Sequence, residues 1–534
     1  MSHQVEQKKR QVEIASYMLG MLSLLILGNK IGEDGVAYTA VSFEVFLFFE
    51  MCIGSRLADT IGKLLRARTA KGQYKNAEKL KRNVMFTEFL AGLSASVLFF
   101  IVTWFVGKNL PGGVYHVAIM QLLAPAVVLH TLVCVLLGYF QAEGTELPSV
   151  ISYVMRQVCI LLFSLLLIHV FGGYGQKVST LLRQEHFTAM YSGMGVALAI
   201  TLSEVFVLIF LFLVYRSSRG KTKKNNGEGL RTTDTFGSQM SALLRSVCPM
   251  VVIALLRHLP IWFGILFFYR AASENGAWNV YGVYYGKYLP VMGLCVFPAL
   301  IFLLGYGYRV VGSLRKDEQR YARNYFSNGL HFAIVYGLFV SVFVAMLATP
   351  IADLIGAGEA ASVADMLRFG SFLIGFAAIG YYFVQIMLLM NGKLQVMGVF
   401  AGRGIVFLIA LIGLLHKDGI GVFALIYAGL IAAVVYAVTA CILVCYQMRF
   451  GVDWARTLAL PAGAACVAGL LLFFVGRGIS PHLGNLLAIL LCLVLGGAVY
   501  LLILLCTRNF TETELTQYPG GKFLLMIGRL LRLY

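Results

Sequence analysis

Charged residues are scarce in this sequence. Only 13% of its 534 residues are Asp, Glu, Lys or Arg, about half the share found in soluble domains. Hydrophobic residues make up 59%, and the mean hydropathy is +0.81. A soluble fold of this length has no interior large enough for so much apolar surface. The composition therefore excludes a soluble protein and predicts one that lipid solvates.

Motifs for soluble chemistry are also missing. The ten cysteines lie almost entirely in apolar runs, without a Cys-x-x-Cys pair or a His-rich ligand spacing, so we expect inert thiols and neither a metal site nor a cofactor. No Gly-x-Ser-x-Gly or phosphate-binding loop is present, and no catalytic residue is predicted. A membrane glycosyltransferase or polymerase needs a sizeable exposed loop and a carboxylate base. It stays a remote alternative, because the longest non-cytoplasmic loop, FGGYGQKVSTLLRQEHFTAMYSG, holds one acid, Glu185.

Long apolar runs fill most of the chain. A helix needs about 20 such residues to cross the hydrocarbon core. Fourteen runs qualify, and we predict an all-α polytopic membrane protein. The polar start, MSHQVEQKKRQ, and the absence of a small-residue cleavage site argue against a cleaved signal peptide. The runs centre near Met21, Leu47, Leu98, Val128, Leu162, Glu204, Leu256, Leu294, Val335, Gly375, Leu408, Val434, Leu470 and Val494.

Basic residues collect in alternate loops. One side of the membrane receives Lys8–Arg10, Lys63–Arg82, Arg216–Lys224 and Arg315–Arg323. The loops assigned to the other side, among them KNLPGG and HKDG, have few basic residues. This pattern predicts that both termini are cytoplasmic. It also explains the net charge of +18 without a nucleic-acid partner.

A faint internal repeat divides the chain. The polar segment from Arg216 to Thr235 is typical of a flexible linker, and a basic, Tyr-containing stretch follows the second span of each half. We predict two six-helix lobes in a pseudo-two-fold relation, a plan common among alternating-access transporters. The predicted parts are a first lobe (1–215), a basic linker (216–240), a second lobe (241–450), two further helices (451–507) and a cytoplasmic amphipathic tail (508–534).

Three passages resemble one family. The first, GEDGVAYTAVSFEVFLFFEMCIGSRLADTIGKLLRARTAKGQYKNAEKL, has Gly-x-x-Gly leading into a span and a basic Tyr-x-x-Ala stretch after it. The second, LAPAVVLHTLVCVLLGYFQAEGTELPSVISYVMRQV, joins two spans through Gly-Tyr-Phe-Gln. The tail, TETELTQYPGGKFLLMIGRLL, has Glu-Leu, then Pro-Gly-Gly, then a basic helix. Together they are similar to MOP-superfamily exporters, closest to the polysaccharide flippase branch and its stage V sporulation protein B-like proteins.

The resemblance implies a bacterial plasma-membrane exporter that is not an enzyme. It implies an undecaprenyl-pyrophosphate-linked saccharide, either a cell-wall precursor or a polysaccharide repeat unit, that moves from the inner to the outer leaflet. The first helix, IASYMLGMLSLLIL, lacks the arginines of lipid II flippases, which leaves the identity of the saccharide open. A multidrug or organic-cation antiporter of the same superfamily is the main alternative. It would have an acidic, aromatic cavity without a mid-membrane arginine.

Ionisable residues at mid-span mark the candidate site, because a charge at bilayer depth normally faces a cavity or a partner. Arg257 and Lys287, with Arg56 nearer the inner end, are candidates for binding pyrophosphate, since guanidinium matches phosphate oxygens. Glu44, Glu50 and Glu204 are candidates for coupling to a proton or sodium ion. The alternative is that these acids and bases only pair with one another. Arg156 and Arg403 lie toward the cytoplasmic side and are weaker candidates, and His258 is expected to be a packing residue.

The stretch YGVYYGKY places four tyrosines on one helical face. They match an interfacial aromatic belt, and a glycan contact is the alternative. Gly282 and Gly286 form a Gly-x-x-x-Gly step that predicts close approach of another helix.

Overall fold

The computed structural model is all-helical within the described residues (3–222, 234–273, 278–356, 360–417, 419–451, 453–518 and 520–530) and confirms the predicted fold class. The chain forms two compact units, residues 1–286 and 287–534, each described here by itself. Residues 223–233 of the predicted linker lie outside the described residues.

The first unit begins with a long helix, α1, that reverses direction. A straight helix of 67 residues would be about 100 Å long, more than three times the hydrocarbon thickness of about 30 Å. Gly32 has a φ of 78°, which breaks the helical path. Lys9 Nζ lies 2.7 Å from Asp59 Oδ1 although 50 residues separate them. Helix α1 is therefore an antiparallel pair whose arms are the two predicted spans near Met21 and Leu47.

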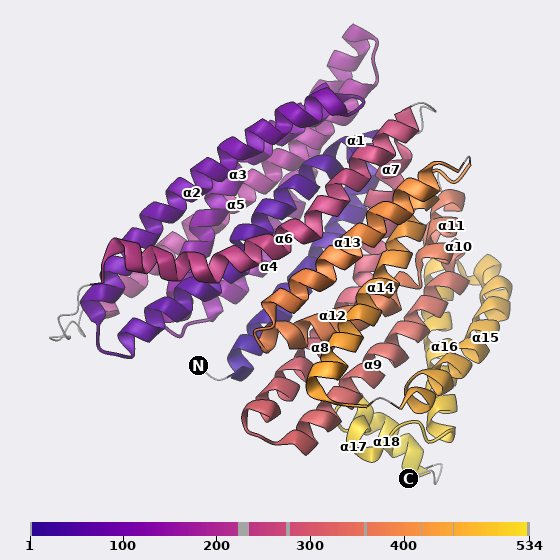
Figure 1. Cartoon of the computed structure of the whole chain (residues 1–534). Coiled ribbons are helices and arrows are strands. Elements are labelled where there is room, and N and C mark those ends of the chain that lie inside the picture. Colours follow the sequence, from indigo (N-terminus) through magenta and orange to yellow (C-terminus); the bar gives the residue numbers. More distant parts are fainter. Residues whose placement is uncertain are drawn as a thin grey trace. The chain divides into compact units, whose positions relative to one another are not determined.

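The remaining helices of the first unit pack around this pair. Helix α4 packs along α5, and α3 contacts α1, α2 and α5. Figure 1 shows the arrangement. The helices are α1 (His3–Thr69), α2 (Tyr74–Asn109), α3 (Gly113–Ala142), α4 (Leu147–Leu182), α5 (His186–Thr222), α6 (Phe236–Ser273) and α7 (Val280–Val283), followed by the π-helical turn η2 (Tyr284–Tyr288).

The second unit contains the rest of the chain. Its helices are α8 (Leu289–Arg315), α9 (Gln319–Met346), α10 (Ala348–Ile355), α11 (Ala360–Gly370), α12 (Leu373–Leu389), α13 (Lys393–Leu415), α14 (Phe423–Met448), the π-helical turn η3 (Ala455–Ala459), α15 (Leu460–Leu483), α16 (Asn485–Cys506), α17 (Glu512–Leu515) and α18 (Gly521–Leu530).

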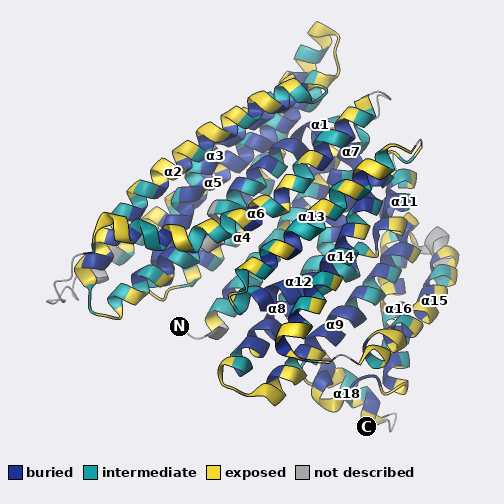
Figure 2. Cartoon of the chain, viewed as in Figure 1, coloured by how far each residue is buried: buried dark blue, intermediate teal, exposed yellow. Residues whose placement is uncertain are grey.

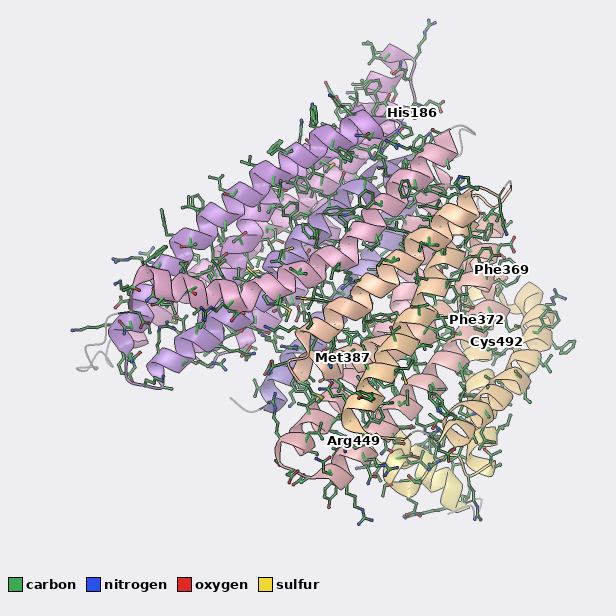
Figure 3. All side chains as sticks on the ribbon, viewed as in Figure 1. His186, Phe369, Phe372, Met387, Arg449 and Cys492 are labelled. Atoms are coloured by element: carbon green, nitrogen blue, oxygen red, sulfur yellow. The ribbon has the colours of Figure 1, made fainter. Side chains whose placement is uncertain are left out.

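The spans can be counted from these elements. Twelve described helices are long and apolar enough to cross a membrane, and the bent pair α11–α12 makes a thirteenth. The bend measures 47°, and Phe369 and Phe372 flank it (Figure 3). Because α1 contains two arms, the described residues provide fourteen spans, as predicted. Exposed apolar residues run along α2 and α13 (Figure 2), where Phe86, Trp104 and Ile409 each expose more than half of their surface. Lipid solvates such faces in a membrane protein.

The Gly-x-x-x-Gly step from α7 into η2 confirms the predicted close approach. A Cβ at Gly282 would collide with the backbone carbonyl of Glu33, and one at Gly286 would lie 3.0 Å from Val36. The aromatic-belt interpretation is wrong for three of the four tyrosines. Tyr281, Tyr285 and Tyr288 are at most 6% exposed, so they pack inside the protein and do not face headgroups.

Candidate transport site

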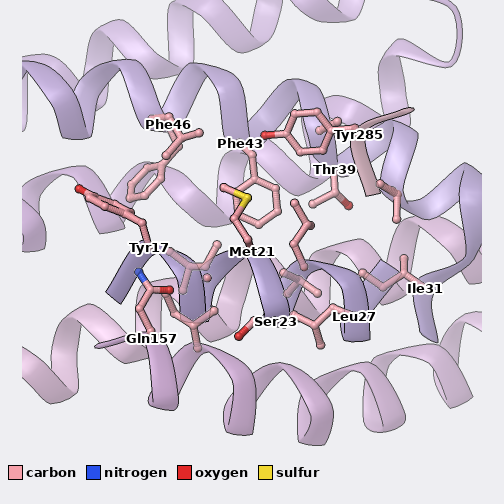
Figure 4. A pocket seen from close by; sticks show the side chains of 18 of the residues that line it. Tyr17, Met21, Ser23, Leu27, Ile31, Thr39, Phe43, Phe46, Gln157 and Tyr285 are labelled. Atoms are coloured by element: carbon pink, nitrogen blue, oxygen red, sulfur yellow. The ribbon is translucent and has the colours of Figure 1, made fainter. Parts of the chain in front are cut away.

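A cavity of about 150 Å³ lies inside the first unit. The two arms of α1 form most of its wall, with α4, α5 and Tyr285 completing it. Most of the lining is apolar or aromatic, and Met21 lies among the rings of Tyr17, Phe43 and Phe46 (Figure 4). An apolar cavity with a few polar groups is typical of sites that bind organic molecules.

Charged groups meet at one part of the cavity lining. Arg156 of α4 donates from Nη1 to Glu50 Oε1 at 2.5 Å and from Nη2 to Glu50 Oε2 at 3.1 Å. This is the bidentate fork that guanidinium forms with carboxylate. Its Nε also lies 2.6 Å from Glu204 Oε1 of α5. The side chains of all three residues are at most 12% exposed.

His130 of α3 extends the group. Its Nδ1 is 3.2 Å from Glu204 Oε1, and its Nε2 is 3.4 Å from the Cys134 thiol. We call Glu50, Arg156, Glu204 and His130 the Arg156 cluster. Four spans (the second arm of α1, α3, α4 and α5) each contribute one member.

The cluster has one more carboxylate than it has permanent cations. Glu50 and Glu204 contribute two negative charges when ionised, and Arg156 contributes one positive charge. A buried net charge is costly, so a proton on His130 or on a carboxyl group, or a bound cation, has to balance it. Among the described residues no donor forms a hydrogen bond to Oε2 of Glu204, which has no exposed side-chain surface. A proton or another cation at this oxygen would make the cluster neutral.

Glu44 lies apart from this cluster. His258 Nδ1 of α6 is 3.6 Å from its carboxylate, and Tyr285 forms a hydrogen bond with the same side chain. Trp262 donates from Nε1 to the Glu44 backbone carbonyl at 3.4 Å. The structure thus brings Glu50 and Glu204 together on one arginine and gives Glu44 its own partners. His258 is 5% exposed, in agreement with the predicted packing role.

Arg257 is exposed near the middle of α6. Its Nη1 contacts the Met51 sulfur at 3.8 Å. No carboxylate in the described part of the chain forms an ion pair with it, so it does not pair with Glu44, Glu50 or Glu204. Arg257 and two members of the cluster, Glu50 and Arg156, act electrostatically on Tyr17, which lines the cavity.

The two other predicted cargo ligands are Lys287 and Arg56. Lys287 begins the second unit and is 6% exposed. Arg56 lies on α1, and its side chain is outside the described residues. Neither position tests the predicted role.

Sequence reasoning undervalued Arg156 and missed His130. Arg156 lies nine residues into α4. It was a weak candidate only because its position in the sequence placed it toward the cytoplasmic side of its span. His130 was visible as a solitary ionisable residue in the apolar run APAVVLHTLVCVLL. Only the packing of α3 against α5 shows that it faces Glu204.

Comparison with known proteins gives structural relatives only. No family model and no curated protein matches the sequence. An inward-facing multidrug resistance MATE family transporter of the MOP superfamily aligns with a TM-score of 0.61 at 13% identity over 80% of this chain and 94% of its own. The chain has a MATE-like fold. A MOP superfamily transporter from Pyrococcus furiosus is described as having a binding pocket of reverse polarity. It aligns with a TM-score of 0.58 at 13% identity, over 83% of this chain and 95% of its own. A eukaryotic MATE transporter aligns with a TM-score of 0.60 at 16% identity, over 86% of this chain and 96% of its own.

Proposed function

We propose that this chain is an ion-coupled, alternating-access exporter that moves an undecaprenyl-pyrophosphate-linked saccharide from the inner to the outer leaflet of a bacterial plasma membrane. The MATE-like fold supports a transporter, since proteins of this fold are described in both inward-facing and outward-facing conformations. The assignment of the cargo rests on other observations.

Arg257 carries the proposal for the cargo. An exposed arginine near mid-span without a carboxylate partner is costly in lipid, and a polyanionic ligand offsets that cost. Pyrophosphate accepts the bidentate fork of a guanidinium. The same unit also has an apolar, aromatic cavity, which suits the isoprenoid part of such a cargo.

The Arg156 cluster carries the proposal for coupling. Its excess carboxylate binds a proton or sodium ion in one state and releases it in the other. Glu204 and Glu50 are the coupling residues in this scheme, and Glu44 with His258 is a second candidate. The proposal includes no nucleic acid and no cofactor.

Substitution of Arg257 tests the cargo assignment. Arg257→Ala removes one or two charge-assisted hydrogen bonds, which should lower export about 10- to 100-fold. Arg257→Lys keeps the charge without the fork and should retain part of the activity. The measurement is the amount of lipid-linked intermediate that accumulates in a deletion strain that carries each variant. Arg245→Ala, near the start of the same helix, is the matched control and should export normally. Full export by Arg257→Ala at normal abundance would contradict the assignment.

An organic-cation antiporter is the second candidate, because the structural neighbours include multidrug transporters and the Arg156 cluster is acidic. Uptake of tetraphenylphosphonium into proteoliposomes separates the two. For a cation carrier, removal of Arg257 should leave uptake unchanged or raise it, because one repulsive charge is lost.

Orientation belongs to the same proposal. Both termini and the loop 216–235 should face the cytoplasm. Single cysteines in KNLPGG and in KTKKNN of a cysteine-free chain should be labelled from opposite sides. Labelling of both from one side would reject the orientation.

A further inference from the structure

The segment after the last span is fixed to the second unit by a buried polar cluster. Asn509 Nδ2 lies 2.9 Å from His331 Nε2 of α9, and the Tyr518 hydroxyl lies 3.2 Å from His331 Nδ1. Arg456 of η3 donates from Nη2 to Glu514 Oε2 at 2.7 Å and from Nε to the Asn509 carbonyl at 3.0 Å. We call His331, Arg456, Asn509, Glu514 and Tyr518 the tail cluster.

Local sequence also shapes this segment. Thr511 and Glu514 form a capping box that starts α17. Gly521 begins α18 directly against the Leu515 carbonyl, where a Cβ has no room. Because α17 contacts α9 and η3 through the tail cluster and contacts α18 directly, α18 has a defined position near the end of α16 (Figure 1).

Helix α18 has a buried side and a broad exposed side. Gly521 and Gly528 are buried against the protein. An apolar row at i, i+3 and i+7 spacing lies on the exposed side, and in it Phe523 is 61% exposed, Met526 61% and Leu530 83%. Lys522 and Arg529 are also exposed and form one edge of this side, next to Met526.

The surroundings of α18 indicate what covers the apolar row. Helix α16 is a membrane span that ends at Cys506, so α18 starts only a short distance from the bilayer. Trp454, 53% exposed just before η3, marks the interfacial depth at this end of the unit. Between residues 507 and 530, in the described part of the tail, the exposed charges are Arg508, Lys522 and Arg529 against Glu512, which lies 3.9 Å from Arg529. An exposed pair at that distance is weak, and the local charge stays positive.

We infer that α18 is a rigidly held lipid-binding element whose apolar row enters the membrane interface and whose bordering basic residues, Lys522 and Arg529, bind anionic headgroups. Amphipathic helices with large apolar residues beside Lys and Arg bind membrane surfaces in this way. The cytoplasmic leaflet, where the predicted topology places α18, is the anionic one. This inference does not depend on the identity of the cargo.

Fluorescence of single labels on the full chain in vesicles tests the inference. A bimane label at Phe523→Cys or Met526→Cys in a cysteine-free chain should be shielded from aqueous iodide and quenched by nitroxide-labelled lipid. A label at Lys522→Cys should stay accessible to iodide. Equal iodide quenching at positions 522 and 523 would overturn the inference. So would protection that appears only at high protein-to-lipid ratio, because a second copy would then cover the row.

Hydrogen exchange on the unmodified chain provides a second test that needs no cysteine-free protein. The amides of residues 520–530 should exchange more slowly in nanodiscs of equal phosphatidylcholine and phosphatidylglycerol than in nanodiscs of phosphatidylcholine alone. We expect a difference of at least about fivefold, because that is the effect of about one basic residue near an anionic surface. Lys522→Gln combined with Arg529→Gln should remove this difference. Lys316→Gln, an exposed basic residue in the α8–α9 loop, should keep it. Equal exchange in both lipids would overturn the role of anionic headgroups.

Discussion

Each unit pairs an arginine with at least one buried carboxylate, but the two clusters differ in charge balance. Arg156 in the first unit lies between two carboxylates, Glu50 and Glu204. Arg456 in the second unit forms an ion pair with one, Glu514. The first cluster needs an additional cation to be neutral, whereas the second is neutral with His331 uncharged. A cluster that needs a cation can couple transport to ion movement, and a balanced one can only hold structure.

Location supports the same distinction. Arg156 and Glu50 line a cavity, and the cluster joins four spans. The tail cluster joins α9 and η3 to a segment that follows the last span. We therefore propose that the same residue types serve different purposes in the two clusters, and that charge count together with access to a cavity distinguishes them. Three matched pairs of substitutions test this comparison.

The largest effect is expected from loss of the first arginine. Arg156→Ala leaves two carboxylates buried without their cation, which should destabilise the fold by about 3–5 kcal/mol. Arg456→Ala should cost about 1 kcal/mol, because the Arg456 side chain is 38% exposed and water replaces part of its role. Thermal unfolding of both variants in detergent measures the difference. Similar losses would mean that the clusters do not differ in the way proposed.

The next effect concerns pH. Glu204→Gln removes the excess carboxylate and leaves Arg156 paired with Glu50, so the fold should persist while export loses its dependence on protons. The export rate should become nearly flat between pH 5.5 and 8, a range of about 2.5 units that changes proton concentration about 300-fold. Glu514→Gln is the matched change in the balanced cluster and should keep the wild-type pH profile. If both variants keep that profile, Glu204 is not the coupling residue, and Glu44→Gln becomes the next substitution to measure.

Sequence alone predicted the membrane spans well, but it predicted poorly which charged side chains pair with one another. Apolar runs and the polar break around Gly32 predicted the two arms of α1, because span length and helix-breaking residues are local properties. Mid-span acids were also visible, since an ionisable residue in an apolar run is rare. Which acid meets Arg156 depends on how α1, α4 and α5 rotate about their axes, and no local pattern encodes that. His130 shows the same limit, because its role depends on α5, which lies more than 50 residues further along the chain.

The smallest effect is expected from the tail cluster. His331→Ala removes the hydrogen-bonding contacts to Asn509 and Tyr518, and each is worth about 1 kcal/mol. Amide exchange in residues 508–518 should rise about 5- to 30-fold, while export should change less than about twofold, because the affected groups line no cavity described in the first unit. His258→Ala is the matched change beside Glu44 in the first unit. It should alter export more than it alters exchange in the tail. A loss of export in His331→Ala as large as that in Glu204→Gln would show that the tail cluster takes part in transport, and the distinction between a coupling cluster and a structural one would fail.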